Sequence, residues 1–164
     1  MVADEGIATM CVQWRAVVHL AGGLIVWLDH RGSEVLERNE CLRLLALGAG
    51  AVGRVGLVEP EGVLIVPVNY RMLDHDVMVH VGDGSILDAA QGEAIVAFEI
   101  DEVDNAAGQA WSVFVRGLAT VLDEDDRPQD ARPRDGKPLV REPGVSFVRI
   151  RTGILSGRRF QLRP

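Results

Sequence analysis

Residues 51–72, AVGRVGLVEPEGVLIVPVNYRM, decide the fold class. Two runs rich in β-branched and other apolar residues, 51–58 and 63–72, flank the turn sequence Glu-Pro-Glu-Gly at 59–62. Runs of this composition on both sides of a turn containing Pro and Gly predict a β-hairpin. Pro67 has no N–H to donate to a neighbouring strand, so it predicts an edge or a bulge at that point of the second run.

More extended segments follow toward the C-terminus. The predicted strands are 77–81, 94–101, 110–122, 145–151 and 158–163. Gly117 lies inside the longest of them and predicts a bend, as expected where a sheet curls into a barrel. Residues 102–109 form a polar loop, and 123–144, rich in Asp, Arg and Pro, predict a loop with little regular structure.

Helical spacing occurs twice. Ser33 is a possible N-cap for a helix that Gly48 and Gly50 end, and Ser85 is a possible cap for a short helix through Gln91. The apolar positions of the first helix are Leu36, Cys41, Leu44 and Leu45. The order helix, three strands, short helix, three or four strands predicts a mainly β, antiparallel, Greek-key-like barrel whose ends the helices cover. It excludes a doubly wound α/β fold.

Composition places the chain among ordinary folded proteins of one main domain. It has 164 residues, 48% of them apolar and 25% charged, and a net charge of −7. The acidic balance argues against bulk nucleic acid as the main partner. Cys11 and Cys41 form no CxxC pair, which favours the reducing cytoplasm. The four histidines form no HExxH motif and no GxSxG occurs, so neither a metal site nor a hydrolase is predicted.

Residues 1–32 are taken as an N-terminal extension and 33–164 as the barrel domain. The apolar stretch 16–28, AVVHLAGGLIVWL, is shorter than the roughly 20 residues that span a bilayer. Asp4 and Glu5 are unlike the basic start of a signal peptide. The open alternatives are a hairpin turning at 22–23, a docked arm, or disorder.

Six segments, in this order, resemble the pyridoxamine 5'-phosphate oxidase-like family, in particular its actinobacterial flavin-binding branch with nitroimidazole-reductase relatives. The segments are ECLRLLALGAGAVGRVGLV (40–58), VLIVPVNYRM (63–72), VMVHVGDGSILDAA (77–90), AIVAFEIDEVD (94–104), AWSVFVRGLATVL (110–122) and FVRIRTGILSGRRF (147–160). The resemblance implies a split-barrel homodimer with FMN at the subunit interface; some relatives carry the deazaflavin coenzyme or haem instead. The candidate cofactor-binding residues that follow are Pro67, Asn69, Tyr70, His80, Val81, Gly84, Ser85, Trp111 and Arg116.

The turn at 82–85 suits the cofactor phosphate, because backbone N–H groups at a helix start and the Ser85 hydroxyl can bind an anion. An ordinary helix cap is the alternative. Relatives commonly have a lysine where this chain has Ile86, and losing such a charge-assisted hydrogen bond costs about 1.5–3 kcal/mol. A protonated His80 offers partial compensation, unless it simply faces solvent. Asp83 is expected to face water, since it would repel a phosphate.

The other candidates also have two interpretations. Alternation places Asn69 toward the ring or ribityl edge and Tyr70 on the opposite face, where it is equally suited to the core. Trp111 is either a wall for the flavin or part of a dimer interface. Arg116 needs a partner, which is either a phosphate or Glu99 on the preceding strand.

The predicted function is flavin-dependent oxidation or reduction of a small organic molecule. The alternatives are a cofactor-binding or vestigial barrel without turnover, which Ile86 favours, and a dimeric interaction module. The short chain argues against true pyridoxamine phosphate oxidation. The arginines after residue 145 suit either a solvated strand face that balances the acidic loops or a site for an anionic group. They are Arg149, Arg151, Arg158, Arg159 and Arg163.

Overall fold

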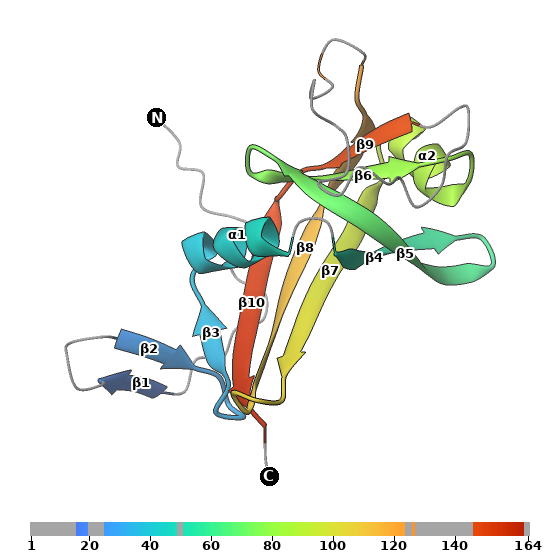
Figure 1. Cartoon of the computed structure of the whole chain (residues 1–164). Helices are drawn as coiled ribbons and strands as arrows, with labels where there is room; N and C mark the ends of the chain where they lie inside the picture. The colour runs from blue at the N-terminus through green and yellow to red at the C-terminus, as the bar shows by residue number, and fades with distance from the viewer. Residues whose placement is uncertain (1–15, 20–24, 49–50, 124–125, 127–145, 163–164) are drawn as a thin grey trace, which may run out of the picture.

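The fold is a closed antiparallel β-barrel continued on one side by an open sheet (Figure 1). The computed structural model describes residues 16–19, 25–48, 51–123, 126 and 146–162. Ten strands and two helices lie in these ranges. They are β1 (Ala16–His19), β2 (Ile25–Leu28), β3 (Glu34–Leu36), α1 (Arg38–Leu47), β4 (Val52–Glu59), β5 (Gly62–Leu73), β6 (Asp76–Val81), α2 (Ser85–Gln91), β7 (Ile95–Asp104), β8 (Gln109–Val121), β9 (Ser146–Ile150) and β10 (Ile154–Gln161).

Six of these strands make the barrel. Neighbours pair in the order β8-β7-β4-β5-β6-β9, and β9 pairs back onto β8 to close the ring. The predicted hairpin is confirmed as β4–β5, with Val58 opposite Val63. At Pro67, β5 pairs with β4, whereas its pairing with β6 covers only Tyr70–Leu73. The missing proline N–H is therefore tolerated where the structure gives β5 a partner on one side only.

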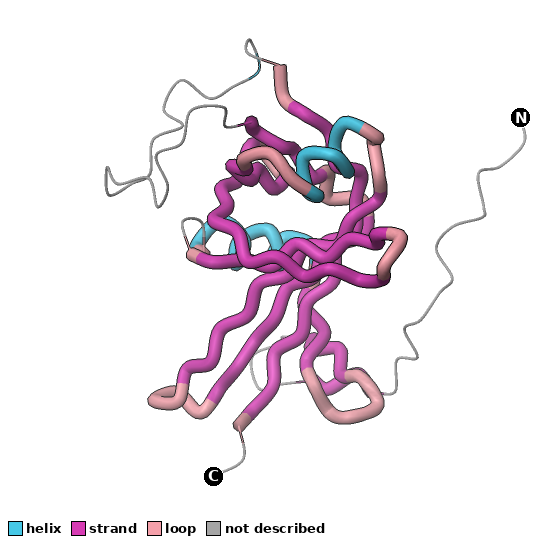
Figure 2. Tube along the Cα trace, turned by 90° about the vertical axis from the view of Figure 1, so that its right-hand side faces the viewer, coloured by secondary structure: helices cyan, strands magenta, loops and turns pink. Residues whose placement is uncertain are grey.

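The open sheet extends from the same edge of β8 as β9, the edge away from β7, along the first part of the strand. There β10 pairs with β8, β3 pairs with β10, and the β1–β2 hairpin follows on β3. From the side, the closed part with both helices lies above a splayed sheet (Figure 2). The predicted N-terminal hairpin is present as β1–β2, and its predicted turn at 22–23 lies outside the described residues.

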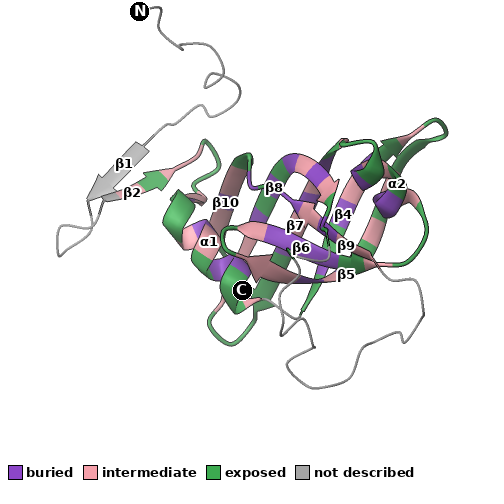
Figure 3. Ribbon diagram, turned by 90° about the horizontal axis from the view of Figure 1, so that it is seen from above, coloured by how far each residue is buried: buried purple, intermediate pink, exposed green. Residues whose placement is uncertain are grey.

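The core fills the barrel between the inward faces of the strands and the two helices. Buried positions alternate along β4 and β8, whereas β6 has three consecutive buried residues, Val77–Val79 (Figure 3). Tyr70 and Phe98 meet edge to face with ring centroids 4.9 Å apart, and α1 and α2 contribute Leu45 and Leu87. The Tyr70 hydroxyl donates to the Leu45 carbonyl at 2.8 Å, which ties β5 to α1.

Gly117 is the corner of β8, as predicted. Before it β8 pairs with β10, where Arg116 faces Ile154, and after it β8 pairs with β9, where Ala119 faces Ile150. A Cβ on Gly117 would lie 1.6 Å from the Arg151 carbonyl oxygen. Only glycine lets the two backbones approach this closely, and this approach allows the barrel to close.

Four predicted boundaries are wrong. The predicted polar loop at 102–109 is only 105–108, because β7 continues to Asp104 and β8 begins at Gln109. Glu34–Leu36 are a strand, and α1 begins at Arg38 with Glu37 as its N-cap, because β2 and β10 pair with that segment. Gly84, not Ser85, is the N-cap of α2. The last strand begins at Ile154, not 158, because it pairs with β8 along its whole length. The predicted loop at 123–144 lies almost entirely outside the described residues.

The outside of the barrel carries an apolar surface that we call the outer apolar face. Its strands, β5, β4, β7, β8 and β10, are consecutive neighbours. Its exposed members are Val58, Val63, Ile65, Ile95, Phe114 and Ile154. Within the described residues, no helix is long and apolar enough to cross a membrane.

Candidate cofactor site

Three strands bring the central part of the candidate site together on the outside of the barrel. His80 on β6 lies opposite Phe147 on β9, and their rings stack at a tilt with centroids 4.7 Å apart. Asn69 lies on the same outward side of β5, since Tyr70 beside it points into the core. An exposed imidazole stacked on a half-buried phenyl ring, next to an amide side chain, suits a planar, polar-edged ligand.

His80 carries a neutral imidazole more readily than a free histidine does. Partial burial and the nearby charge of Arg71 lower the pKa of His80 below its usual 6.5. Arg71 lies two residues beyond Asn69 on β5 and so shares its face. Sequence analysis missed Arg71, although the same alternation that selected Asn69 would have found it.

The turn between β6 and α2 leaves backbone donors at a helix start. Gly84 has φ 144° and ψ −172°, a conformation that favours glycine, and no side chain caps α2. The first helical bond runs from the Asp88 N–H to the Gly84 carbonyl at 3.0 Å, so the N–H groups of the first turn precede it. A Cβ on Gly84 would meet nothing within 4 Å, so space lies open there. Asp83 is exposed, as predicted.

Ile86 has a structural reason for being apolar. Its side chain is only 6% exposed and belongs to the hydrophobic core. It therefore supplies packing where a lysine would supply charge, and Arg71 is a cation on the outward side of the neighbouring strand β5. Ser85 is half-buried at the start of the same helix.

Two predicted site residues, Tyr70 and Val81, pack against the core, and Pro67 lies at the edge of this group. Tyr70 is 1% exposed and its hydroxyl is already bonded to Leu45, so the structure assigns it to the core and removes it from the site. Val81 is half-buried and packs against the core. Pro67 is exposed on the outer side of β5, opposite Arg54.

The two candidates on β8 point to opposite sides. Trp111 is half-buried against the core, on the inner side, whereas Arg116 is exposed on the outer side. They cannot face one ligand within a single chain. The expected pairing of Arg116 with Glu99 is wrong, because the register sets Phe114 opposite Glu99.

Glu99 belongs to a different ion cluster. Arg54 donates to Glu99 at 3.1 Å and to Asp101 at 2.5 Å. Burial, and then the charge of Asp101, raise the pKa of Glu99. Within the described residues Arg116 has no ion-pair partner, and it stands beside Phe114 and Ile154 on the outer apolar face.

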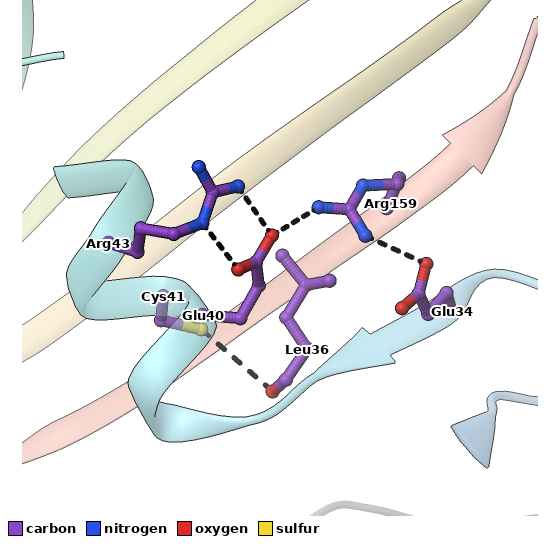
Figure 4. Close-up of polar contacts among 6 residues, drawn as sticks. All are labelled: Glu34, Leu36, Glu40, Cys41, Arg43 and Arg159. Carbon is purple, nitrogen blue, oxygen red and sulfur yellow. Dashed lines mark hydrogen bonds and ion pairs between the residues drawn. The ribbon is translucent and has the colours of Figure 1, made fainter. Parts of the chain in front are cut away.

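The C-terminal arginines are mostly engaged in ion pairs. Arg158 pairs with Asp29 at 3.3 Å, and Arg159 pairs with both Glu34 and Glu40 (Figure 4). Hydrogen bonds from Arg43 and Arg159 hold the pKa of Glu40 at about 2, despite partial burial that opposes the shift. These contacts fasten β3 and α1 to β10, which supports the structural interpretation of Arg158 and Arg159. Arg163 lies outside the described residues.

No group of three or more His, Cys, Asp or Glu side chains within the described ranges is arranged to hold a metal ion. Cys41 is buried, and its thiol lies 3.8 Å from the Leu36 carbonyl. Burial, more than any charge, raises the pKa of Cys41. The arrangement on the outer side of β5, β6 and β9 is therefore suited to binding and orienting a ligand, with no side chain set up as a nucleophile.

The fold defines the class: a mostly β protein built on a six-stranded closed antiparallel barrel of the split-barrel type. A sequence profile of the pyridoxamine 5'-phosphate oxidase family matches residues 37–159, and the chain belongs to this family. The match includes every barrel strand and leaves β1–β3 outside.

Solved structures of related chains agree. A Corynebacterium glutamicum protein named after pyridoxamine 5'-phosphate oxidase is 27% identical with a TM-score of 0.64, over 80% of this chain and 96% of that one. An FAD-binding protein from Mycobacterium smegmatis is 30% identical with a TM-score of 0.61, over 77% of this chain and 99% of that one.

A curated Mycobacterium tuberculosis protein of uncharacterised function is 31% identical over 97 residues, which are 56% of this chain. The match spans 62% of the length of that relative.

Proposed function

We propose that this chain binds a flavin as a homodimer and transfers electrons between that flavin and a small organic molecule. The observation that carries the proposal is the outward side of β5, β6 and β9. There His80, stacked on Phe147 of β9, lies on β6, the strand that leads directly into the uncapped start of α2. The FAD-binding relative at 30% identity supports a flavin as the planar ligand.

The residues present fit such a ligand. The backbone N–H groups after Gly84 and the Ser85 hydroxyl bind the phosphate, and Arg71 supplies the positive charge that Ile86 cannot. Asn69 hydrogen-bonds the polar edge of the ring or the ribityl chain. A bound flavin supplies the redox chemistry, while the protein positions the substrate and excludes water. No side chain of a catalytic dyad is required.

The outer apolar face supports the homodimer. Val58 and Val63 are 81% and 75% exposed at its end, and Ile65 and Ile95 are each more than 60% exposed. Contiguous apolar surface of this kind marks an association site, and a second copy of the same chain is the simplest symmetric partner. In such a dimer Arg116, unpaired within the described part of its own chain, can contribute to a site that it does not reach alone.

The test is a spectrum of the purified protein, followed by separate titrations with FMN, FAD, reduced deazaflavin and haemin. We expect a flavin absorbance band, or saturable binding of FMN or FAD with a shift of that band. Ser85→Ala and Arg71→Gln should weaken the binding, whereas Ser33→Ala, a half-buried serine between β2 and β3, should not. Saturable binding of haemin or deazaflavin alone, or of no cofactor at all, would overturn the flavin assignment.

Binding without turnover is the second candidate function. It is favoured by Ile86, whose burial leaves the phosphate turn without the lysine common in relatives. Reduction of a nitro compound or a quinone by the flavin-loaded, prereduced protein separates the two. Turnover above that of free reduced flavin supports the oxidoreductase, and its absence with intact flavin binding supports the carrier.

A further inference from the structure

A concave site lies at the opposite end of β6 from the candidate cofactor site. The β5–β6 turn, the β9–β10 turn and the start of α1 enclose a cavity of about 490 Å³ that opens to solvent. This volume falls in the range of small-molecule sites. Asp76 begins β6 at the cavity and His80 lies four residues on, which is about 13 Å along an extended strand. On β9 the cavity and the ring pair are closer, because Arg149 lines the cavity and Phe147 lies two residues before it on the same side of the strand, about 7 Å away.

One half-buried carboxylate forms part of the wall of this cavity. Asp76, whose side chain is 14% exposed, accepts hydrogen bonds from Arg149 Nε at 2.7 Å and from the Thr152 N–H at 2.8 Å. Arg149 Nη2 lies 2.6 Å from the same carboxylate. These contacts hold the Arg149 guanidinium and the β9–β10 turn in place, and the ion pair with Arg149 neutralises the charge of Asp76.

Two further arginines line the cavity without a carboxylate partner. Arg38, the first residue of α1, donates to the neutral Thr152 hydroxyl at 3.2 Å. Arg151 is exposed, and within the described ranges its guanidinium makes no ion pair. The unpaired acid in the lining is Asp74, and His75 stands beside it. The lining therefore contains three arginines and two aspartates. Because Arg149 neutralises Asp76, Arg38 and Arg151 face one remaining acid, Asp74, and the cavity has excess positive charge.

We propose that this cavity binds a small anion carrying several carboxylate or phosphate oxygens, held by Arg38 and Arg151. A planar guanidinium can donate two parallel hydrogen bonds to a pair of carboxylate or phosphate oxygens, and Arg149 is held in place next to Arg38 and Arg151. The cavity is too small for a macromolecular ligand and too rich in donors for an apolar one. This inference does not depend on the proposed flavin, because none of its residues belongs to the cofactor site.

Inorganic phosphate and citrate are the probes, measured by calorimetry and by thermal shift at constant ionic strength with sodium chloride as the reference. We expect saturable binding of at least one probe. If only phosphate or only citrate binds, that result identifies whether the cavity prefers phosphate or carboxylate oxygens. Arg151→Ala should weaken binding about tenfold or more, as expected for a lost charge-assisted hydrogen bond. An unfolding curve checks that Arg151→Ala is folded. We expect it to be, because within the described residues the Arg151 side chain makes no hydrogen bond or ion pair that the substitution would remove.

Arg31→Ala is the matched control, because Arg31 is another exposed arginine without an ion pair in the described part of the chain and lies in neither site. It should bind both probes like the unaltered protein, with or without saturating FMN. The proposal is overturned if neither probe binds at about 1 mM, or if Arg151→Ala and Arg31→Ala have the same effect. A failure of flavin binding leaves this result unchanged, so the two proposals are tested separately.

Discussion

Replacing Ile65 by aspartate tests whether the outer apolar face joins two copies of the chain. Ile65 lies on β5 opposite Gly56 and is 64% exposed, so the fold of one chain depends little on it. In a two-fold dimer centred on this face, both copies of Ile65 lose their remaining contact with water. The substitution should therefore spare folding and weaken association.

The magnitude follows from the exposed fraction. Full burial of an isoleucine side chain is worth about 1.5–3 kcal/mol, and roughly two thirds of that is still available to Ile65, so about 1–2 kcal/mol is lost per copy. Two copies give about 2–4 kcal/mol, which raises the dimer dissociation constant by roughly 30-fold to 1,000-fold. An unpaired carboxylate buried in the interface adds to this cost.

Sedimentation velocity over a concentration series measures the dissociation constant, and thermal unfolding checks that the variant is folded. Leu47→Asp is the matched control, because Leu47 is 67% exposed at the end of α1 and lies off the outer apolar face. The reasoning is refuted if the unaltered chain is monomeric at all concentrations, if Ile65→Asp dimerises normally, or if Leu47→Asp dissociates equally.

Three further predictions concern the corner, the core and the cofactor site. Gly117→Ala should lower the free energy of unfolding in urea by about 3 kcal/mol or more, because its Cβ would lie 1.6 Å from a backbone oxygen. Gly56→Ala is the control and should cost under about 1 kcal/mol, because its Cβ would lie 3.6 Å from the nearest atom. Equal costs would contradict the packing argument. Tyr70→Phe should cost about 1–3 kcal/mol in the same assay, because the buried Leu45 carbonyl loses its side-chain donor; an unchanged midpoint would count against this. Flavin affinity should increase as the pH falls toward 6. The pKa of His80 is lowered in the free protein, and a bound phosphate favours the protonated imidazole, so flavin binding takes up a proton. His80→Asn should therefore flatten the pH profile of flavin affinity relative to the unaltered chain.

Much of the fold was predictable from residue periodicity alone. The two apolar runs on either side of the turn at 59–62 predicted the β4–β5 hairpin, and strand alternation sets Val113 and Val115 on the opposite side of β8 from Arg116. These predictions succeed because a strand buries every second side chain, which is a local property of the sequence. The glycine at position 117 likewise marked the corner of β8 before its partner strand was known.

The candidate site depends on pairings that no local pattern contains. His80 contacts Phe147 only because β6 pairs with β9, and the two residues are 67 positions apart in the sequence. Glu99 pairs with Arg54 and not with Arg116, because the strand register sets Glu99 opposite Arg54 on β4 and opposite Phe114 on β8. The segment Glu34–Leu36 became a strand because β10 offered it backbone partners.

The sequence by itself determined which faces are apolar and where the chain turns, because side-chain alternation and turn chemistry act over a few residues. The tertiary structure alone decided that Tyr70 and Ile86 are core residues and that Arg38, Arg149 and Arg151 line one cavity. Register and barrel closure bring distant residues together, and each depends on the free energy of the whole sheet.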